Sequence, residues 1–136
     1  MLVAFWLLRP DCHVCSQRAE MRSAWGSRGR FPRYHMTMLL FVKKRFADAI
    51  RDGSKTLEIR AGSRYRNLAP GDSISINGHF RKRVERVERV EGRENLIASL
   101  RGRFHSAGVS DEREGVRAIR ECYPDDSGEY FVLHLR

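Results

Sequence analysis

The sequence predicts an α+β fold, a small and mostly antiparallel β-barrel with helices at its rim. Short apolar or alternating segments indicate five strands. An Asn-Gly dipeptide at 77–78 lies between two of them and is the strongest short signal for a β-hairpin. The last segment, 128–136, is rich in aromatic and branched residues, so we expect it to return to the sheet. The predicted order, strand–helix–strand–strand–strand–helix–helix–strand, fits a small barrel of about 100 residues.

The first strand and helix are predicted from two adjoining segments. Residues 37–43, "TMLLFVK", form a short apolar run of the length of a buried strand. Residues 44–53 form an amphipathic helix with Gly53 as its C-cap. Its apolar residues recur at spacings of three and four, at Phe46, Ala49 and Ile50.

The second strand, over 55–60, carries an unusual number of charges. Its alternation places Leu57 and Ile59 on one face, and Glu58 and Arg60 on the other. Such a strand is either a solvated edge whose charges resist aggregation or one wall of a binding site.

The middle of the chain predicts a hairpin with an irregular second strand. A tight turn at Pro70-Gly71 precedes the alternating strand 73–78, and the next strand starts at 79. That strand has valines at a period of three, which neither a regular strand nor a helix explains. A β-bulge would reset the alternation. The three residues are Val84, Val87 and Val90.

Two helices are predicted before the last strand, over 94–102 and 111–123. Ser110 or Asp111 is a suitable N-cap for the second. We expect its inner face to consist of Val116, Ile119 and Cys122.

The charge of the chain favours an anionic partner. The 136 residues carry a formal net charge of +9, and nucleic acid is a common partner of small basic domains. Residues 1–35 hold six Arg against two acidic residues, a net charge of +4. That segment lacks helical or strand periodicity, so we expect a flexible extension or a stretch upstream of the true start. The folded domain is expected over 36–136.

The cysteines and the apolar start indicate neither a metal site nor a membrane protein. An odd count of three, Cys12, Cys15 and Cys122, predicts a reducing compartment and a cytoplasmic protein. The pair at 12–15 lacks the further ligands that a structural zinc needs. The eight apolar residues at the start are too few to span a bilayer. We therefore expect no metal, no cofactor and no membrane association.

From about Met38 to Arg136 the chain resembles the ASCH domain of the PUA-like superfamily. The resemblance is carried by a Gly-x-Lys-x-x-Glu-x-Arg run, a later Gly-Asp pair and the terminal "EYFVLHL". It implies a β-barrel with a cleft beside the first helix and the motif strand, and an activity related to RNA. The motif residues are Gly53, Lys55, Glu58, Arg60, Gly71 and Asp72.

Some bacterial ASCH proteins that this chain resembles are acetylcytidine amidohydrolases. Their proposed catalytic set is the motif lysine, a threonine and a downstream glutamate. Lys55 matches the lysine, but the threonine position holds Glu58. The glutamate position falls near Gly108, while Glu91 and Glu94 lie where the alignment is uncertain. The resemblance therefore supports binding better than hydrolysis.

The residues themselves suggest how a ligand would be held. The Lys55 ammonium could lie at a barrel mouth, to bind phosphate or act as a base. Glu58 and Arg60 form either a surface ion pair or a set in which Glu58 orients the cations toward a ligand. Lys44 and Arg45, after Lys43, stand at a predicted helix N-terminus, which attracts anions.

A further candidate is the loop segment "SRYR". Arg64, Tyr65 and Arg66 would stack a base on the ring and contact its phosphates. The prediction is thus an RNA- or nucleotide-binding ASCH domain, with Lys55 as the one candidate catalytic residue. The alternatives are an amidohydrolase acting on a modified nucleoside, or a domain that binds a small ligand or a partner without catalysis. The oligomeric state is not predicted.

Overall fold

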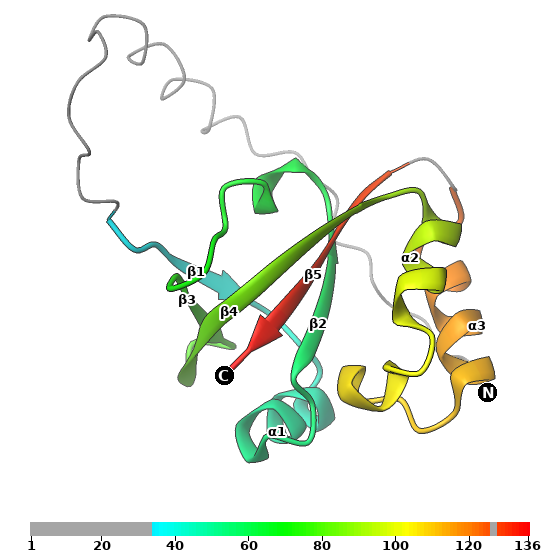
Figure 1. Cartoon of the computed structure of the whole chain (residues 1–136). Helices are drawn as coiled ribbons and strands as arrows, with labels where there is room; N and C mark the ends of the chain where they lie inside the picture. Colours follow the sequence, from blue (N-terminus) through cyan, green and yellow to red (C-terminus); the bar gives the residue numbers. More distant parts are fainter. Residues whose placement is uncertain (1–33, 126–127) are drawn as a thin grey trace, which may run out of the picture. The chain divides into compact units, whose positions relative to one another are not determined.

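A curled half-barrel of five strands forms the frame of the protein (Figure 1). The computed structural model describes residues 34–125 and 128–136, so the extension predicted over 1–35 lies almost wholly outside the described residues. The strands follow the order β1-β3-β4-β5-β2, with β1 and β3 parallel and the other pairs antiparallel. The predicted fold class is confirmed. The strands are β1 (Thr37–Leu40), β2 (Leu57–Ala61), β3 (Ser73–Ile76), β4 (Phe80–Glu91) and β5 (Glu129–Leu135).

Three α-helices and two short 3₁₀ helices connect the strands in the predicted order. The helix ends follow from local chemistry: Gly53 adopts φ +88° at the end of α1, and the Asp111 carboxylate accepts the Arg113 N–H at the start of α3. Cys122 is exposed, so its predicted place on the inner face of α3 is wrong. The helices are α1 (Lys44–Asp52), η1 (Ser63–Tyr65), α2 (Arg93–Leu100), η2 (Phe104–Ala107) and α3 (Glu112–Cys122).

A β-bulge in β4, as predicted, explains the spacing of Val84 and Val87. The register shifts between Val84 and Arg86, so Glu85 has no partner on β5. Val84 and Val87 consequently face the same core although they are three residues apart. No bulge separates Val87 from Val90, and Val90 packs on the opposite side of the sheet.

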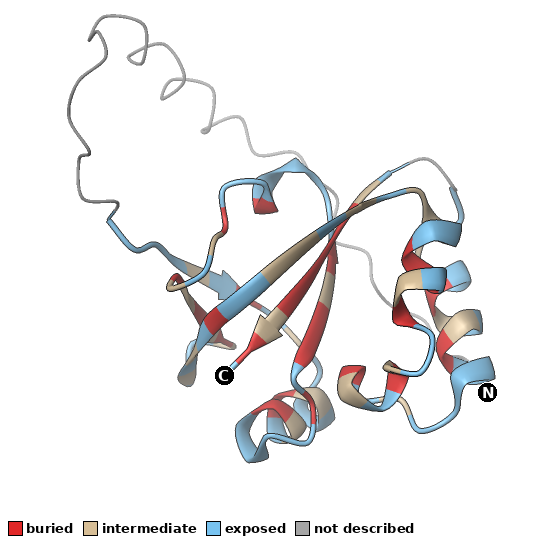
Figure 2. Ribbon diagram, in the orientation of Figure 1, coloured by how far each residue is buried: buried red, intermediate tan, exposed pale blue. Residues whose placement is uncertain are grey.

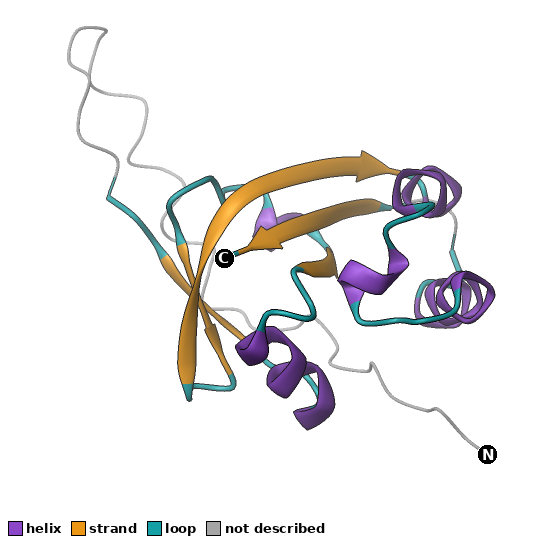
Figure 3. Cartoon of the chain, turned by 60° about the horizontal axis from the view of Figure 1, so that its bottom comes forward, coloured by secondary structure: helices purple, strands orange, loops and turns teal. Residues whose placement is uncertain are grey.

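The sheet separates two hydrophobic clusters. Inside the half-barrel, α1 packs against one cluster, which includes Leu40, Ile74 and Phe131. On the other side, α2, η2 and α3 cover β2, β5 and the far half of β4 around Leu96 and Val132. Figures 2 and 3 show these helices beside the buried strands. β5 is consequently buried on both faces, which explains its nearly continuous apolar run.

Asp72 ties the start of β1 to the turn before β3. Its carboxylate is fully buried and accepts the backbone N–H groups of Met36 and Ala69, at 3.0 and 2.9 Å. The Gly-Asp pair therefore has a structural task, because it fixes the entry of the chain into the parallel pair of strands.

Candidate ligand-binding site

The predicted cleft residues of β2 point into the half-barrel. Glu58 pairs with Leu133 and Arg60 with Phe131, and both partners belong to the interior cluster. Leu57 and Ile59 pack on the other side, under the helices. The charged face of this strand is therefore not a solvated edge.

Lys55, Glu58 and Arg60 form one buried cluster. The Glu58 carboxylate lies 3.1 Å from Lys55 Nζ through Oε2 and 2.7 Å from an Arg60 terminal nitrogen through Oε1. The three residues are 5, 4 and 8% exposed. The surface ion pair considered from the sequence is thus wrong, and Glu58 orients both cations. The cluster thus brings two cationic side chains and one carboxylate together in the interior.

The Lys55 ammonium has a full set of acceptors. Besides Glu58, it donates to the carbonyls of Leu57 and Ala107, at 2.6 and 2.8 Å. The Phe46 ring lies 5.3 Å from Nζ, close enough for a cation–π contact. An ammonium has three N–H donors, so the three acceptors occupy all of them.

Arg60 connects β2 to the segment that enters α1. One terminal nitrogen donates to the Phe41 carbonyl at 3.0 Å. The Phe41 side chain is 59% exposed, which makes it an exposed aromatic group beside the buried cations. Sequence reasoning missed Phe41 because it read the residue as part of a buried strand.

Tyr123, at the C-terminal end of α3, is within electrostatic reach of the cluster. Burial raises the pKa of its hydroxyl well above the usual value, and the charge of Arg60 partly opposes that rise. Its ring packs edge-on against Tyr130, with the ring centroids 4.9 Å apart. The sequence distance between Tyr123 and β2 hid this proximity.

Gly108 lies against the stem of Lys55. A Cβ added to this glycine would lie 3.0 Å from Lys55 Cδ and 3.4 Å from the Phe46 ring. The resemblance placed the catalytic glutamate of the hydrolytic relatives near this position. It is adjacent to the motif lysine, but it carries no side chain, and Glu58 is the carboxylate beside the lysine instead.

Lys44 and Arg45 stand exposed at the start of α1, close in sequence to Phe41. Lys44 Nζ binds Asp48 at 2.8 Å, and the Arg45 guanidinium lies 4.5 Å from the centre of the Phe46 ring. Phe46 also contacts Lys55, so the N-terminal turn of α1 covers the buried cluster.

The predicted "SRYR" platform does not have the expected form. The Tyr65 ring is buried, with its centroid 6.1 Å from that of Phe131, so it cannot stack on a base. The long-range contact with Phe131 overrides the loop-like local sequence. Arg64 lies outside that ring, 5.0 Å from its centroid.

Arg66 belongs to a separate surface pocket at the start of β5. The pocket has a volume of about 490 Å³, and within it Glu129 binds both Arg66 and Arg89. Two arginines and two glutamates leave it without net charge. It is lined by Arg66, Arg89, Glu91, Gly92, Gly128 and Glu129.

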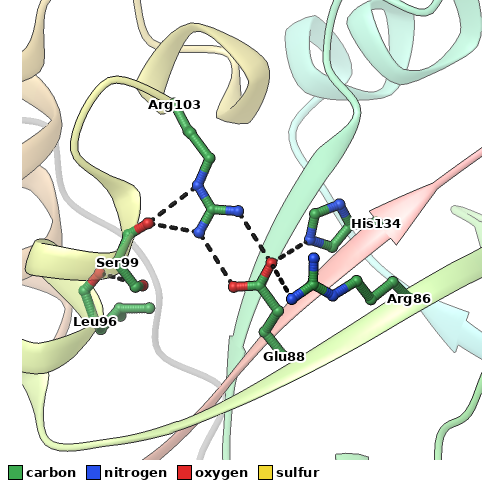
Figure 4. Close-up of polar contacts among 6 residues, drawn as sticks. All are labelled: Arg86, Glu88, Leu96, Ser99, Arg103 and His134. Carbon is green, nitrogen blue, oxygen red and sulfur yellow. Dashed lines mark hydrogen bonds and ion pairs between the residues drawn. The ribbon is translucent and has the colours of Figure 1, made fainter.

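A second charge cluster lies on the outer side of the sheet (Figure 4). Arg103 donates two hydrogen bonds to the Glu88 carboxylate, at 3.0 and 3.1 Å, and His134 Nε2 lies 2.6 Å from Glu88 Oε1. The Arg103 hydrogen bonds, more than His134, lower the pKa of Glu88 to about 2. Arg86 approaches the same carboxylate at 3.7 Å.

The described residues, 34–125 and 128–136, contain neither a helix that could span a membrane nor a group of side chains placed to hold a metal ion. Within these ranges no helix has the length and apolar character needed to cross a membrane. The same ranges contain no group of three His, Cys, Asp or Glu side chains placed to hold a metal ion.

Comparison with known proteins identifies the fold as that of ASCH domains. No family model matches the chain, and no curated protein matches it in sequence. Among solved structures, the hypothetical protein PH0355 is similar over 74% of this chain and 98% of its own, with a TM-score of 0.61 and 19% identity. Protein PF0455 of Pyrococcus furiosus has a TM-score of 0.54 and 20% identity, and the similarity covers 74% of this chain and 97% of its own.

A variant of ZmASCH from Zymomonas mobilis, with a tyrosine changed to phenylalanine, has a TM-score of 0.55 and 19% identity. The similarity covers 75% of this chain and 70% of that protein. At these identities the likeness concerns the fold, and the ASCH-type fold inferred from the motif is thereby confirmed.

Proposed function

We propose that this protein binds a nucleotide, free or within single-stranded RNA, beside the N-terminal turn of α1. The observation that carries the proposal is the buried cluster of Lys55, Glu58 and Arg60, which holds two cations against one carboxylate. The positive charges of Lys55 and Arg60 attract anions, and this attraction is stronger inside a protein than in water. The cluster therefore favours a ligand with negative charge.

The surroundings of the cluster suit the two parts of a nucleotide. The exposed Phe41 ring offers a stacking surface for a base. Lys43, Lys44 and Arg45 follow within four residues at the start of α1, where free backbone N–H groups and the helix dipole add to the attraction for phosphate. The Arg60 bond to the Phe41 carbonyl would keep the stacking group in place before the ligand arrives.

Binding without hydrolysis agrees with the chemistry at Lys55. Its ammonium is engaged by three acceptors, and the position near which the resemblance places the catalytic glutamate is Gly108, which has no carboxylate. Both Glu58 carboxylate oxygens are engaged by Lys55 and Arg60.

The test is binding of fluorescent mononucleotides and a short single-stranded RNA, followed by anisotropy at two salt concentrations. Phe41→Ala should weaken both ligands about five- to tenfold, in line with about 1–3 kcal/mol for one stacked base. Because Phe41 is exposed, the fold should survive. Met36→Ala is the matched control, since Met36 is another exposed apolar residue of the segment before α1, and it should change affinity less than twofold.

Arg60→Lys tests the cluster itself while keeping its charge. Loss of the planar fork should weaken binding without unfolding the protein. Wild-type affinity in both Phe41→Ala and Arg60→Lys would refute this site. Incubation with acetylcytidine provides a second readout, because turnover that disappears in Lys55→Ala would replace binding with the hydrolase alternative.

A further inference from the structure

The outer face of β1, β3 and the near half of β4 carries a row of arginines. Ile74, Ile76 and Val84 are buried in the half-barrel, so their neighbours along each strand point outward. In Figure 2, parts of β1 and of β4 are coloured as exposed. The outward arginines of β4 are Arg81, Arg83 and, after the bulge, Arg86, and all three are exposed.

Strand pairing adds a fourth arginine to this row. Arg83 and Arg136 exchange both backbone hydrogen bonds, at 3.0 and 2.9 Å, so their side chains stand directly opposite on one face. Like charges opposite one another destabilise a sheet. Arg86 similarly stands opposite His134. The acidic residues nearby are Glu85 at the bulge and Glu88, which Arg103 and His134 already hold.

Hydroxyl groups lie between these charges. Ser75 pairs with Arg81, and Ser73 pairs with Arg83. On the next strand Thr37 pairs with Ser73, and Leu39 with Ser75. Arginine and small hydroxyl side chains are the groups that contact phosphate oxygens in nucleic-acid complexes. We name this surface the arginine face: Thr37, Leu39, Ser73, Ser75, Arg81, Arg83, Arg86 and Arg136.

We propose that the arginine face binds the phosphate backbone of single-stranded RNA. Alternate residues of a strand are about 6.6–6.8 Å apart, a step similar to that of an extended nucleic-acid strand. The guanidinium fork fits phosphate in two hydrogen bonds. An anionic membrane suits this face less well, because Leu39 is its one apolar side chain. The inference goes beyond the proposed nucleotide site, since it concerns another face of the sheet.

The decisive variant is the triple change Arg81→Gln, Arg83→Gln and Arg86→Gln. Its matched control, Arg101→Gln, Arg113→Gln and Arg117→Gln, removes the same charge from exposed arginines near α2 and α3. With a labelled 20-nucleotide RNA, the first variant should bind at least tenfold more weakly. Its log–log salt slope should fall by about 2, given about 0.7 per lost phosphate contact on single strands. The control should change affinity less than twofold.

Equal weakening in both triple variants, or none in either, would overturn the proposal. If the first triple variant does not melt cooperatively, the single changes Arg81→Gln and Arg83→Gln replace it, each with an expected slope change of about 0.7. Phosphatidylserine vesicles and polyglutamate serve as competing anions. Tighter binding to either of them than to RNA would also reject RNA as the partner.

The two proposed sites can fail separately. Mononucleotide binding should depend on Phe41 and not on the arginine face. RNA binding that survives Phe41→Ala but disappears in the first triple variant supports the arginine face and rejects the nucleotide site. The reverse pattern rejects the arginine face.

Discussion

Glu58 and Glu88 are both carboxylates held by two basic side chains, but one lies inside the half-barrel and the other on its outer side. Glu58 binds Lys55 and Arg60 with all three residues buried. Glu88 binds Arg103 and His134, whose side chains are partly exposed. Because the two clusters contain similar residue types, a difference in their contribution to stability reflects burial and not the pairing of charges.

Because the inner cluster is buried, each of its residues depends on the others being present. Two cations removed from water are tolerated only while the carboxylate and the backbone carbonyls replace their hydration. In the outer cluster, water can replace a lost partner, so a substitution there should destabilise the protein less. We therefore expect the inner cluster to be rigid and the outer one to be adjustable.

The largest effect should follow from Glu58→Gln. The change leaves Lys55 and Arg60 buried with one charge fewer to offset them, and breaking a buried pair costs about 3–5 kcal/mol. Urea unfolding should show a loss of that size in the free energy of unfolding. The comparison change Glu88→Gln should cost about 1–2 kcal/mol, so similar losses in the two variants would contradict the contrast.

The next effect concerns the packing around Lys55. Gly108→Ala places a methyl group against the Lys55 stem at φ +85°, whereas Gly53→Ala at φ +88° meets no atom within 4 Å. Both should lose about 1 kcal/mol for the left-handed backbone. Gly108→Ala should lose a further 1–2 kcal/mol from overpacking. Thermal melting of the pair measures the difference, and equal melting temperatures would mean that the inner cluster adapts.

The sequence predicted the strands and turns that hold the inner cluster better than the contacts around it. Local signals were sufficient for the Asn-Gly hairpin, the bulge behind the β4 valines and the Gly53 cap. The motif spacing also brought Lys55, Glu58 and Arg60 to one region. Contacts made through the tertiary fold were not predictable in this way: Gly108 reaches Lys55, and Tyr65 reaches Phe131, only after the chain has folded.

The outer cluster around Glu88 should make the stability of the protein depend on pH. The pKa of Glu88 lies at about 2, below its ordinary value near 4.5. Its contribution to stability is therefore complete above pH 4.5 and is lost as the pH falls toward 2. Glu88→Gln should flatten the stability curve between pH 4.5 and pH 2. Arg103→Gln should flatten it to a smaller extent, because the Arg103 hydrogen bonds are the main cause of the lowered pKa. The measurement is the free energy of unfolding between pH 5 and pH 2. If it changes with pH in parallel for wild type and Glu88→Gln, Glu88 does not contribute to acid sensitivity.

The smallest effect should come from a charge that neither cluster uses. Lys44 is 90% exposed and binds Asp48 one turn along α1. Such a pair contributes about 0.3–0.5 kcal/mol, and a cation at a helix N-terminus opposes the helix dipole by a similar amount. Lys44→Ala should therefore leave the free energy of unfolding within about 0.5 kcal/mol of wild type. Nucleotide affinity should nevertheless fall two- to threefold with a weaker salt dependence, because Lys44 is the first residue of α1, where the phosphate is proposed to bind. A stability loss without an affinity loss would show that Lys44 serves α1 and not a ligand.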